Sequence, residues 1–369
     1  MKKKILILAT SQVTIESFLL PHIQKLKKKY DITILTKLNR SKLVISNVKI
    51  FNINLDRKIN FLNDVKNLIF LLNFLRLNTF NLIFTITPKA GLIGMLSAYV
   101  NRIPKRLHIF TGQVWSNKNF FIRNILKLFD KLIMILSNET LCDGKEQRKF
   151  LIKNSFSKKI KVLGNGSICG VDTDLFKSNK SQRIKLRKNF NFKNDEVIFL
   201  YVGRLNKDKG IYNILQVSKL LSDKNYKFKI VLVGNYEDEN LSYEIKKNKK
   251  ILHINHSNNI SKFYQFADVF ITSSYREGFG MTVAQAMASS LPIIGTNIYG
   301  LKDLLKNGKN CIIYEPDDIN KFFLSCCKLI KNKRLRKNLG LLGRKQIVKK
   351  FQEKDLVNNY EKFFKMKLG

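Results

Sequence analysis

Short apolar runs alternate with longer helical patterns along most of the chain, and this alternation constrains the fold more than any other feature. Residues 5–9 form an uninterrupted apolar run, residues 11–30 follow helical spacing, and Asp31–Thr36 is the next strand-like run. The same order begins again at residues 197–202. Strands that alternate with helices predict an α/β fold with parallel sheets. The chain of 369 residues is long enough for two such domains.

The stretch 270–288, FITSSYREGFGMTVAQAMA, predicts a ligand site in the second domain. It reads as the end of a buried strand, a polar loop with two glycines, and a helix that begins at Met281. Such a loop directs backbone N–H groups at a bound anion, most often a phosphate, because unpaired amides and the helix dipole act together. Glu277 in the loop and Gln285 in the helix can accept hydrogen bonds from hydroxyl groups. These parts suit a nucleotide sugar.

This stretch resembles the signature of retaining glycosyltransferases of family 4. The resemblance implies the GT-B fold, in which two Rossmann-like domains face each other across a cleft and a C-terminal helix crosses back to the first domain. In the family the first Glu of the signature contacts the donor sugar, which assigns that role to Glu277. The second Glu binds the ribose hydroxyls, and Gln285 stands in its place here. Gln285 can still form such hydrogen bonds, although without a charge.

A second motif follows the strand at residues 197–202, where residues 203–210 read GRLNKDKG. In the family the matching Gly-Arg and Lys-Gly positions hold the donor diphosphate. Arg204 offers a planar fork and Lys209 a point charge, and both suit phosphate oxygens. We therefore expect Arg204 and Lys209 to act with Glu277 in catalysis. The expected donor-binding residues are Gly203, Gly278, Phe279, Gly280, Met281, Thr282 and Gln285.

Two segments of the first domain, TPKAGLIG at residues 87–94 and FTGQVW at residues 110–115, resemble a bacterial subset of family 4. That subset builds capsule, O-antigen or related glycans on a polyprenyl diphosphate. Many members carry His-Gly where this chain has Thr111-Gly112, so His108 is a nearby candidate for the missing histidine. A strand-end histidine satisfied by the backbone is an equal alternative. The expected acceptor-side residues are Lys89, Gly112, Gln113 and Trp115. Packing is the alternative for Trp115, and a solvated charge is the alternative for Lys89.

The net charge of +41 suggests nucleic acid or an anionic membrane surface as a partner. No recognised nucleic-acid module or aromatic-interleaved basic stripe supports the first, and a compositional bias toward Lys accounts for part of the charge. Residues 117–136 place Phe, Ile and Leu on one helical face and Lys and Arg on the other. Such a helix can lie on an anionic membrane, or it can cover a core with a solvated basic back.

Cysteine spacing and the terminal segment bear on location. The five cysteines show no metal-ligand spacing, and their odd number fits a reducing cytoplasm. The apolar run after the basic start is too short for a signal peptide, and no segment is apolar for long enough to span a bilayer. We expect a cytoplasmic protein without a metal or a cofactor, peripheral on the inner face of the plasma membrane.

The sequence thus predicts a retaining, metal-independent hexosyltransferase that uses a UDP-linked sugar and acts in surface polysaccharide synthesis. The expected domains are 1–175 on the acceptor side, 176–345 for the nucleotide sugar, and 346–369 as the returning helix, with a linker at 178–193. One alternative is a UDP-sugar epimerase of the same fold, which has no need for the two acceptor-side segments. The other is a degenerate, non-catalytic sugar- or nucleotide-binding protein, suggested by Gln285 and Thr111.

Overall fold

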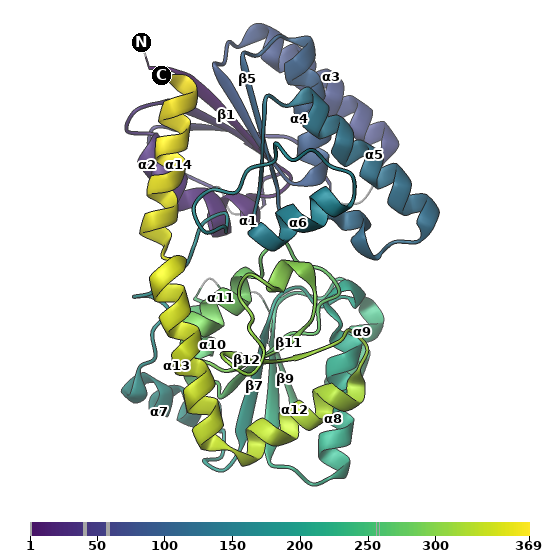
Figure 1. The fold of residues 1–369 in the computed structure, drawn as a ribbon, viewed down its shortest axis with the longest axis vertical. Helices are drawn as coiled ribbons and strands as arrows, with labels where there is room; N and C mark the ends of the chain where they lie inside the picture. Colours follow the sequence, from purple (N-terminus) through teal and green to yellow (C-terminus); the bar gives the residue numbers. More distant parts are fainter. Residues whose placement is uncertain (1, 40–42, 57–59, 256, 258) are drawn as a thin grey trace. The chain divides into compact units, whose positions relative to one another are not determined.

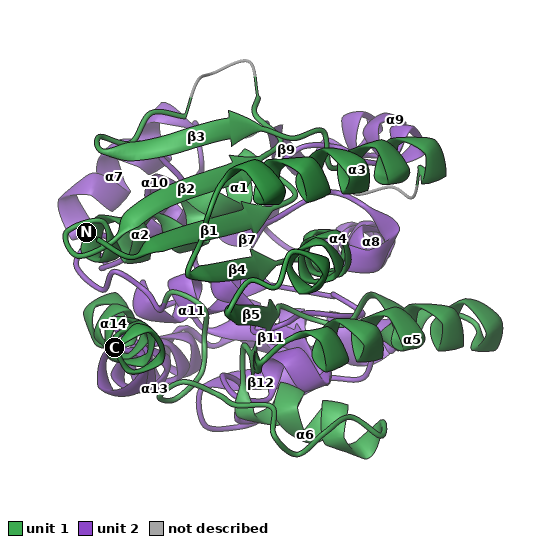
Figure 2. Cartoon of the chain, turned by 90° about the horizontal axis from the view of Figure 1, so that it is seen from above, with its two compact units in different colours: residues 1–169, 353–369 green, residues 170–352 purple. Residues whose placement is uncertain are grey.

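The computed structural model describes residues 2–39, 43–56, 60–255, 257 and 259–369. The chain forms two compact units (Figures 1 and 2). Unit 1 contains residues 1–169 and 353–369, and unit 2 contains residues 170–352. The boundaries therefore fall after Cys169 and Gln352, in place of the expected 175 and 345. The last helix, α14 (Glu353–Leu368), belongs to unit 1.

Unit 1 is built on a six-stranded parallel sheet in the order β3-β2-β1-β4-β5-β6. Four of its strands are almost wholly buried, because helices cover both faces. This explains why they read as continuous apolar runs. The strands are β1 (Lys4–Ala9), β2 (Asp31–Thr36), β3 (Val48–Asn52), β4 (Leu82–Ile86), β5 (Lys105–Phe110) and β6 (Glu139–Cys142).

Helices α3, α4 and α5 lie in a row on one face of this sheet, and α2 packs with α14 on the other (Figure 2). Helix α4 approaches the sheet closely, since a Cβ at Gly94 would lie 2.7 Å from atoms of both Leu8 and Thr85. The small residues of TPKAGLIG therefore serve packing. The helices of unit 1 are α1 (Gln12–Thr14), η1 (Ile15–Leu19), α2 (Leu20–Leu26), α3 (Phe61–Leu77), α4 (Pro88–Val100), η2 (Val114–Asn117), α5 (Phe120–Leu136), α6 (Lys145–Lys153) and α14.

Unit 2 repeats the plan with a second six-stranded parallel sheet, ordered β12-β11-β10-β7-β8-β9. Its strands are β7 (Val197–Val202), β8 (Phe228–Val233), β9 (Ile251–Ile254), β10 (Val269–Ile271), β11 (Ile293–Thr296) and β12 (Cys311–Tyr314). Its helices are α7 (Lys180–Asn189), η3 (Lys207–Lys209), α8 (Ile211–Asp223), α9 (Glu239–Lys247), α10 (Ser261–Phe266), α11 (Met281–Ala288), η4 (Tyr299–Leu301), α12 (Ile319–Lys331) and α13 (Lys333–Lys350). The alternation predicted from the sequence is confirmed in both units.

The strand order of unit 2 reverses at β7, which lies between β10 and β8. At such a switch point the loops after neighbouring strands turn apart and leave a crevice at the carboxyl edge, where ligands bind in open α/β sheets. The loops in question are 203–210 after β7 and 272–280 after β10. They are the two motifs that the sequence analysis singled out.

Residues 178–193, expected to be a linker, contain helix α7. The polar sequence of α7 carries no apolar signal for a packed helix, because ion pairs to a carboxylate attach this helix to the rest of unit 2. The guanidinium groups of Arg183 and Arg187 contact the Asp268 carboxylate at 2.6 and 3.0 Å. Arg187 is itself buried. Within the described residues, none of the helices combines the length and apolar character needed to cross a bilayer.

Candidate donor site in unit 2

The loops after β7 and β10 are in direct contact at Gly210 and Ser273. A Cβ at Gly210 would lie 2.1 Å from the Ser273 carbonyl oxygen, and Gly210 has a φ of +65°. The Ser273 hydroxyl donates a hydrogen bond to the Gly210 carbonyl oxygen at 2.6 Å. The Tyr275 N–H donates to the Asp208 carbonyl oxygen at 3.0 Å. Only glycine allows both the left-handed backbone and this close approach, so residue 210 fixes the two motifs against each other.

Lys209 and Glu277 meet across this junction. The Lys209 ammonium lies 2.5 Å from the Glu277 carboxylate, and both side chains are largely buried, with 17% and 20% exposed. The Ser274 hydroxyl donates a second hydrogen bond to the same oxygen at 2.9 Å. The backbone of Glu277 is held as well, because a Cβ at Gly300 would lie 2.0 Å from its carbonyl oxygen. The structure therefore brings together two of the expected catalytic residues from different motifs.

Arg204 lies on the same loop as Lys209 and contacts a carboxylate that the sequence analysis missed. Its guanidinium is 2.6 Å from the Glu237 carboxylate, which also accepts a hydrogen bond from the Asn206 amide at 2.7 Å. Glu237 lies after β8, and Gly234, the residue directly after that strand, packs on Gly203. The glycine at that strand end was the available sequence signal, but nothing in the pattern points to residue 237 itself.

Helix α11 begins at the end of the second motif, with Gly280 in a left-handed conformation at φ +80°. A Cβ there would lie 2.4 Å from Leu301. The Phe279 side chain is 2% exposed and contacts Phe351 edge-on. Phe279 therefore belongs to the core of unit 2, and only its backbone is available for the expected donor contact. Gly278, Met281 and Thr282 flank the same turn, where first-turn N–H groups favour an anion.

Gln285 lies half-buried in α11 and already has a partner. Its side-chain oxygen accepts a hydrogen bond from the Tyr264 hydroxyl at 3.1 Å. Tyr264 is buried beneath the helix. Because that oxygen is engaged, the amide NH₂ group is the part of Gln285 that suits a ribose oxygen. The residue lies near the glycine turn, as the motif spacing predicts.

His108 does not lie on a surface that a substrate can reach. It is 1% exposed, and its Nδ1 lies 2.7 Å from the Thr85 hydroxyl. A Cβ at Gly91 would lie 2.5 Å from its ring. Burial lowers the pKa of His108 to about 3, so the ring is neutral. The structure therefore corrects the expectation that His108 acts in catalysis and favours the alternative, a buried strand histidine with a hydrogen-bond partner. The partner is the Thr85 side chain and not the backbone.

Trp115 is also a core residue and not an exposed acceptor contact. It is 0% exposed, stacks on Phe150 and Phe156, and donates from Nε1 to the Asp130 carboxylate at 2.8 Å. Lys89 forms an ion pair with Asp64 at 2.7 Å, so it is not a solvated charge. Trp115 thus contacts α5 through Asp130, and Lys89 contacts α3 through Asp64.

Gly112 and Gln113 lie at the carboxyl end of β5, as expected, and both are buried. Gln147 of α6 holds this turn through its side-chain amide, which donates to the Gln113 side-chain oxygen at 3.2 Å and to the Phe110 carbonyl oxygen at 3.1 Å. These two residues lie in the loop after β5, at the ligand-binding edge of the sheet.

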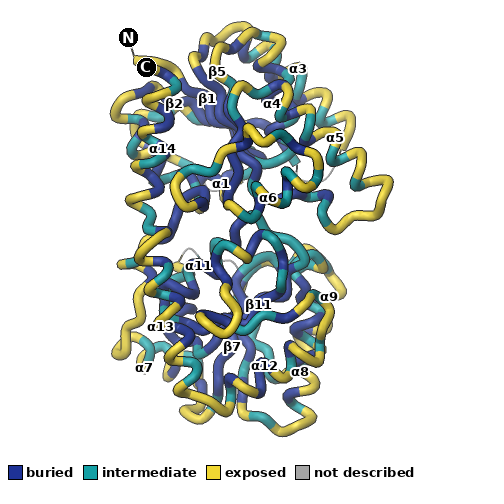
Figure 3. The backbone as a smooth tube through the Cα atoms, viewed as in Figure 1, coloured by how far each residue is buried: buried dark blue, intermediate teal, exposed yellow. Residues whose placement is uncertain are grey.

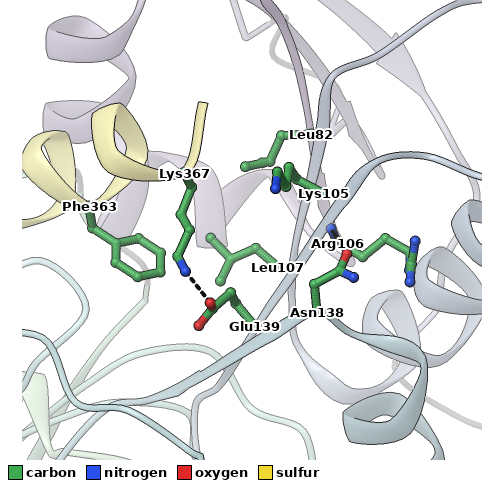
Figure 4. Close-up of a pocket in the computed structure, with 8 residues that line it drawn as sticks. All are labelled: Leu82, Lys105, Arg106, Leu107, Asn138, Glu139, Phe363 and Lys367. Atoms are coloured by element: carbon green, nitrogen blue, oxygen red, sulfur yellow. Dashed lines mark hydrogen bonds and ion pairs between the residues drawn. The ribbon is translucent and has the colours of Figure 1, made fainter. Parts of the chain in front are cut away.

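A small hollow at the other end of this sheet does not serve as the site (Figure 4). It lies between the amino-terminal ends of β4, β5 and β6 and helix α14, and its volume is about 10 Å³, room for roughly one water. The ion pair between Lys367 and Glu139 borders it. Across the described residues, no three His, Cys, Asp or Glu side chains gather as potential metal ligands.

Comparison with known proteins agrees with this geometry. Residues 182–346 match the family model for glycosyl transferases group 1. The chain is 29% identical to the capsular polysaccharide biosynthesis glycosyltransferase CapM of Staphylococcus aureus, over 93% of both chains. It is 25% identical to a UDP-Gal:α-D-GlcNAc-diphosphoundecaprenol α-1,3-galactosyltransferase of Escherichia coli, over 75% of this chain and 73% of the relative.

Solved structures match the fold over nearly the whole chain. HepE of Anabaena, solved with UDP and glucose, superposes with a TM-score of 0.81 at 15% identity, over 99% of this chain and 100% of its own. Sucrose-phosphate synthase of Thermosynechococcus elongatus gives 0.82 at 15% identity, over 99% of both chains. The predicted GT-B fold is confirmed. Together the comparisons support a glycosyltransferase with this fold.

Proposed function

We propose that the protein is a retaining, metal-independent hexosyltransferase of family 4. It transfers a sugar from a UDP-linked donor to a glycan or polyprenyl-diphosphate-linked acceptor in the synthesis of capsule, lipopolysaccharide or a related surface polysaccharide. The E. coli relative, whose name states a diphosphoundecaprenol-linked acceptor, supports this class of acceptor, and the S. aureus relative supports a role in capsular polysaccharide synthesis. The UDP bound to HepE supports the donor. No cofactor is needed beyond the nucleotide sugar itself.

The observation that carries the proposal is the contact of Lys209 with Glu277 beside Arg204, at the switch point of unit 2. In the proposed reaction Arg204 and Lys209 neutralise the charge that develops on the departing diphosphate. The first-turn N–H groups of α11 add to this stabilisation. Glu277 accepts hydrogen bonds from the sugar hydroxyls, and the NH₂ group of Gln285 binds the ribose. The positive charges thus supply the role that a metal ion has in other transferases.

Unit 1 is the proposed acceptor unit. The turn at Gly112 and Gln113 ends β5 at the carboxyl edge of its sheet, the edge at which α/β domains bind ligands. Trp115 and His108 support that turn from below. Their proposed contribution is to position the turn and not to contact the acceptor.

We propose further that the enzyme is cytoplasmic and binds the anionic inner face of the plasma membrane through α5. Its first residues, Phe120 and Phe121, are 84% and 73% exposed, and further apolar side chains of the helix are exposed as far as Ile135. Figure 3 shows the exposed stretches along α5. The only acidic residue of α5, Asp130, is buried. Exposed aromatic side chains with flanking basic residues suit an anionic lipid surface. The basic residues are Lys118, Arg123, Lys127 and Lys131.

A transfer assay tests the catalytic proposal. Purified enzyme is given a panel of UDP-sugars and a polyprenyl-diphosphate-linked GlcNAc acceptor, and the product is analysed by mass spectrometry and by NMR of the new anomeric proton. We expect transfer with retained configuration, lost in Glu277→Gln. Transfer with inversion would refute the retaining mechanism. Binding of UDP without turnover favours the degenerate alternative, and conversion of the UDP-sugar without acceptor favours the epimerase.

Liposome sedimentation tests the membrane proposal. Replacing Lys118, Arg123, Lys127 and Lys131 with Gln is expected to abolish binding to phosphatidylserine vesicles at physiological salt. The matched control removes the same charge from exposed positions on α13 of unit 2. Equal losses in both variants would show that net charge alone drives the binding. The control positions are Lys333, Lys337, Lys345 and Lys349.

A further inference from the structure

The candidate donor site is electrically balanced although the chain is strongly basic. The chain has 68 Lys and Arg residues against 27 Asp and Glu, so fewer than half of its cations can have a carboxylate to themselves. Around the two motif loops, however, three cations each contact one. A site meant only to attract phosphate would not gain from carboxylates at its centre. The pairs are Arg204–Glu237, Lys209–Glu277 and Arg276–Asp208.

Glu237 differs from the other two carboxylates because it lies outside the two motif loops, 203–210 and 272–280. Its position is set by the backbone, through two hydrogen bonds that pair residues 235–237 with Leu205. The Leu205 N–H donates to the Asn235 carbonyl oxygen at 2.9 Å, and the Glu237 N–H donates to the Leu205 carbonyl oxygen at 3.0 Å. The loop after β8 is therefore fixed alongside the loop after β7. This register delivers the carboxylate of Glu237 to the guanidinium of Arg204.

The contact between Arg204 and Glu237 is suited to exchange. Both side chains are 38% exposed, and ion pairs at such positions contribute little to stability because water screens them. A diphosphate carries more charge than a carboxylate and accepts a bidentate hydrogen bond from the same fork. A donor that binds at Arg204 therefore displaces Glu237, and the released carboxylate remains close to the bound phosphates.

We propose that the carboxylate of Glu237 competes with phosphate groups for Arg204 and so lowers the affinity of the site for anions. This inference rests on the proposed function of unit 2 as the nucleotide-sugar site. Glu237 lowers the affinity of every anion that binds Arg204 by a similar factor. A nucleotide sugar offsets that loss because its sugar contacts Glu277, its ribose contacts Gln285, and its base is bound as well. A free phosphate or pyrophosphate makes no such contacts. Glu237 thus lowers the occupancy of the site by weakly bound anions such as free phosphate, whereas a nucleotide sugar binds through its additional contacts.

Isothermal titration of UDP and inorganic pyrophosphate tests the proposal at low ionic strength. The variant Glu237→Gln keeps the acceptor oxygen for Arg204 and Asn206 but removes the charge. We expect it to bind both anions about three- to tenfold more tightly, the range for one partly screened charge near the ligand. Asp195→Asn is the matched control, since it removes one charge from the exposed Asp195–Lys227 pair of the same unit. It is expected to change neither affinity.

Several results would overturn the proposal. Unchanged or weaker binding in Glu237→Gln would show that Glu237 positions Arg204 or has no role. An equal gain in Asp195→Asn, or an equal gain from Glu237→Gln in an Arg204→Ala background, would show a general charge effect. If Glu237→Gln binds pyrophosphate more tightly but no variant binds UDP, the competition at Arg204 is supported and the proposed UDP-linked donor is refuted. Binding of neither anion by any variant would refute both.

Discussion

Replacing Asp130 with Asn is expected to stabilise unit 1 at neutral and alkaline pH. Asp130 is 4% exposed, and the Trp115 Nε1–H is its hydrogen-bond donor at 2.8 Å. Burial raises the pKa of Asp130 from 3.8 to about 7, and the hydrogen bond from Trp115 offsets part of that effect. The folded state therefore holds a proton that the unfolded chain releases near pH 4. Asn keeps the acceptor for Trp115 and has no charge to bury.

The sign and the magnitude follow from this difference in pKa. Between pH 3.8 and about 7 the unfolded state binds fewer protons, so the free energy of unfolding falls as the pH rises. At about 1.36 kcal/mol per pH unit, the full loss is about 4 kcal/mol. Most of this loss, about 3 kcal/mol, falls between pH 5 and pH 8.

Urea unfolding followed by tryptophan fluorescence measures the effect. Trp115 is the only tryptophan of the chain, so the signal reports unit 1. Between pH 5 and pH 8, wild type is expected to lose about 3 kcal/mol more than Asp130→Asn does. Asp31→Asn, an exposed position of the same unit, serves as the control and is expected to follow wild type. If the free energy of unfolding has the same pH dependence in Asp130→Asn and wild type, the claim that Asp130 is buried in its protonated form is refuted.

Three further predictions concern the site and its support. Gly210→Ala is expected to lower UDP affinity at least about tenfold, because its Cβ would meet the Ser273 carbonyl oxygen. Gly308→Ala, also left-handed but with open space around it, is the control, and equal losses would exclude the clash as the cause. Lys209→Met is expected to reduce turnover by about 10²–10³-fold, measured with saturating donor; near-normal turnover would remove Lys209 from the mechanism. Trp115→Phe is expected to cost unit 1 about 1–3 kcal/mol by leaving the buried carboxyl without its donor, measured by urea unfolding followed by circular dichroism, with unchanged UDP affinity; weakened UDP binding would contradict the packing role.

The order of elements and the donor motifs could be predicted because their signals are local. Strands buried on both faces must be apolar, as β7 is throughout and as β1 is after its exposed Lys4. The glycines in the loops after β7 and β10 indicate from the sequence that these loops need a left-handed backbone. Gly210 and Gly280 indeed have positive φ. Short-range patterns of this kind need no knowledge of the tertiary structure.

The misses depend on contacts between distant segments. His108 and Trp115 resemble site residues in the sequence, and only the partners Thr85 and Asp130 show that they are buried. Glu237 reaches Arg204 through the pairing of β7 with β8. Helix α7 lacks a clear apolar face, and ion pairs of Arg183 and Arg187 with Asp268 attach it to the unit. A search for hydrophobic periodicity does not find such a helix.

The most direct test of the central claim is the binding of UDP, compared with GDP and ADP, to wild type and to the double variant Arg204→Ala/Lys209→Ala. If unit 2 binds a UDP-sugar, wild type prefers UDP, and the double variant loses that binding by about a hundredfold or more, because two charge-assisted contacts to the diphosphate are gone. Undiminished UDP binding in the double variant would contradict the proposed site, and no binding of any nucleotide to wild type would contradict the transferase account itself.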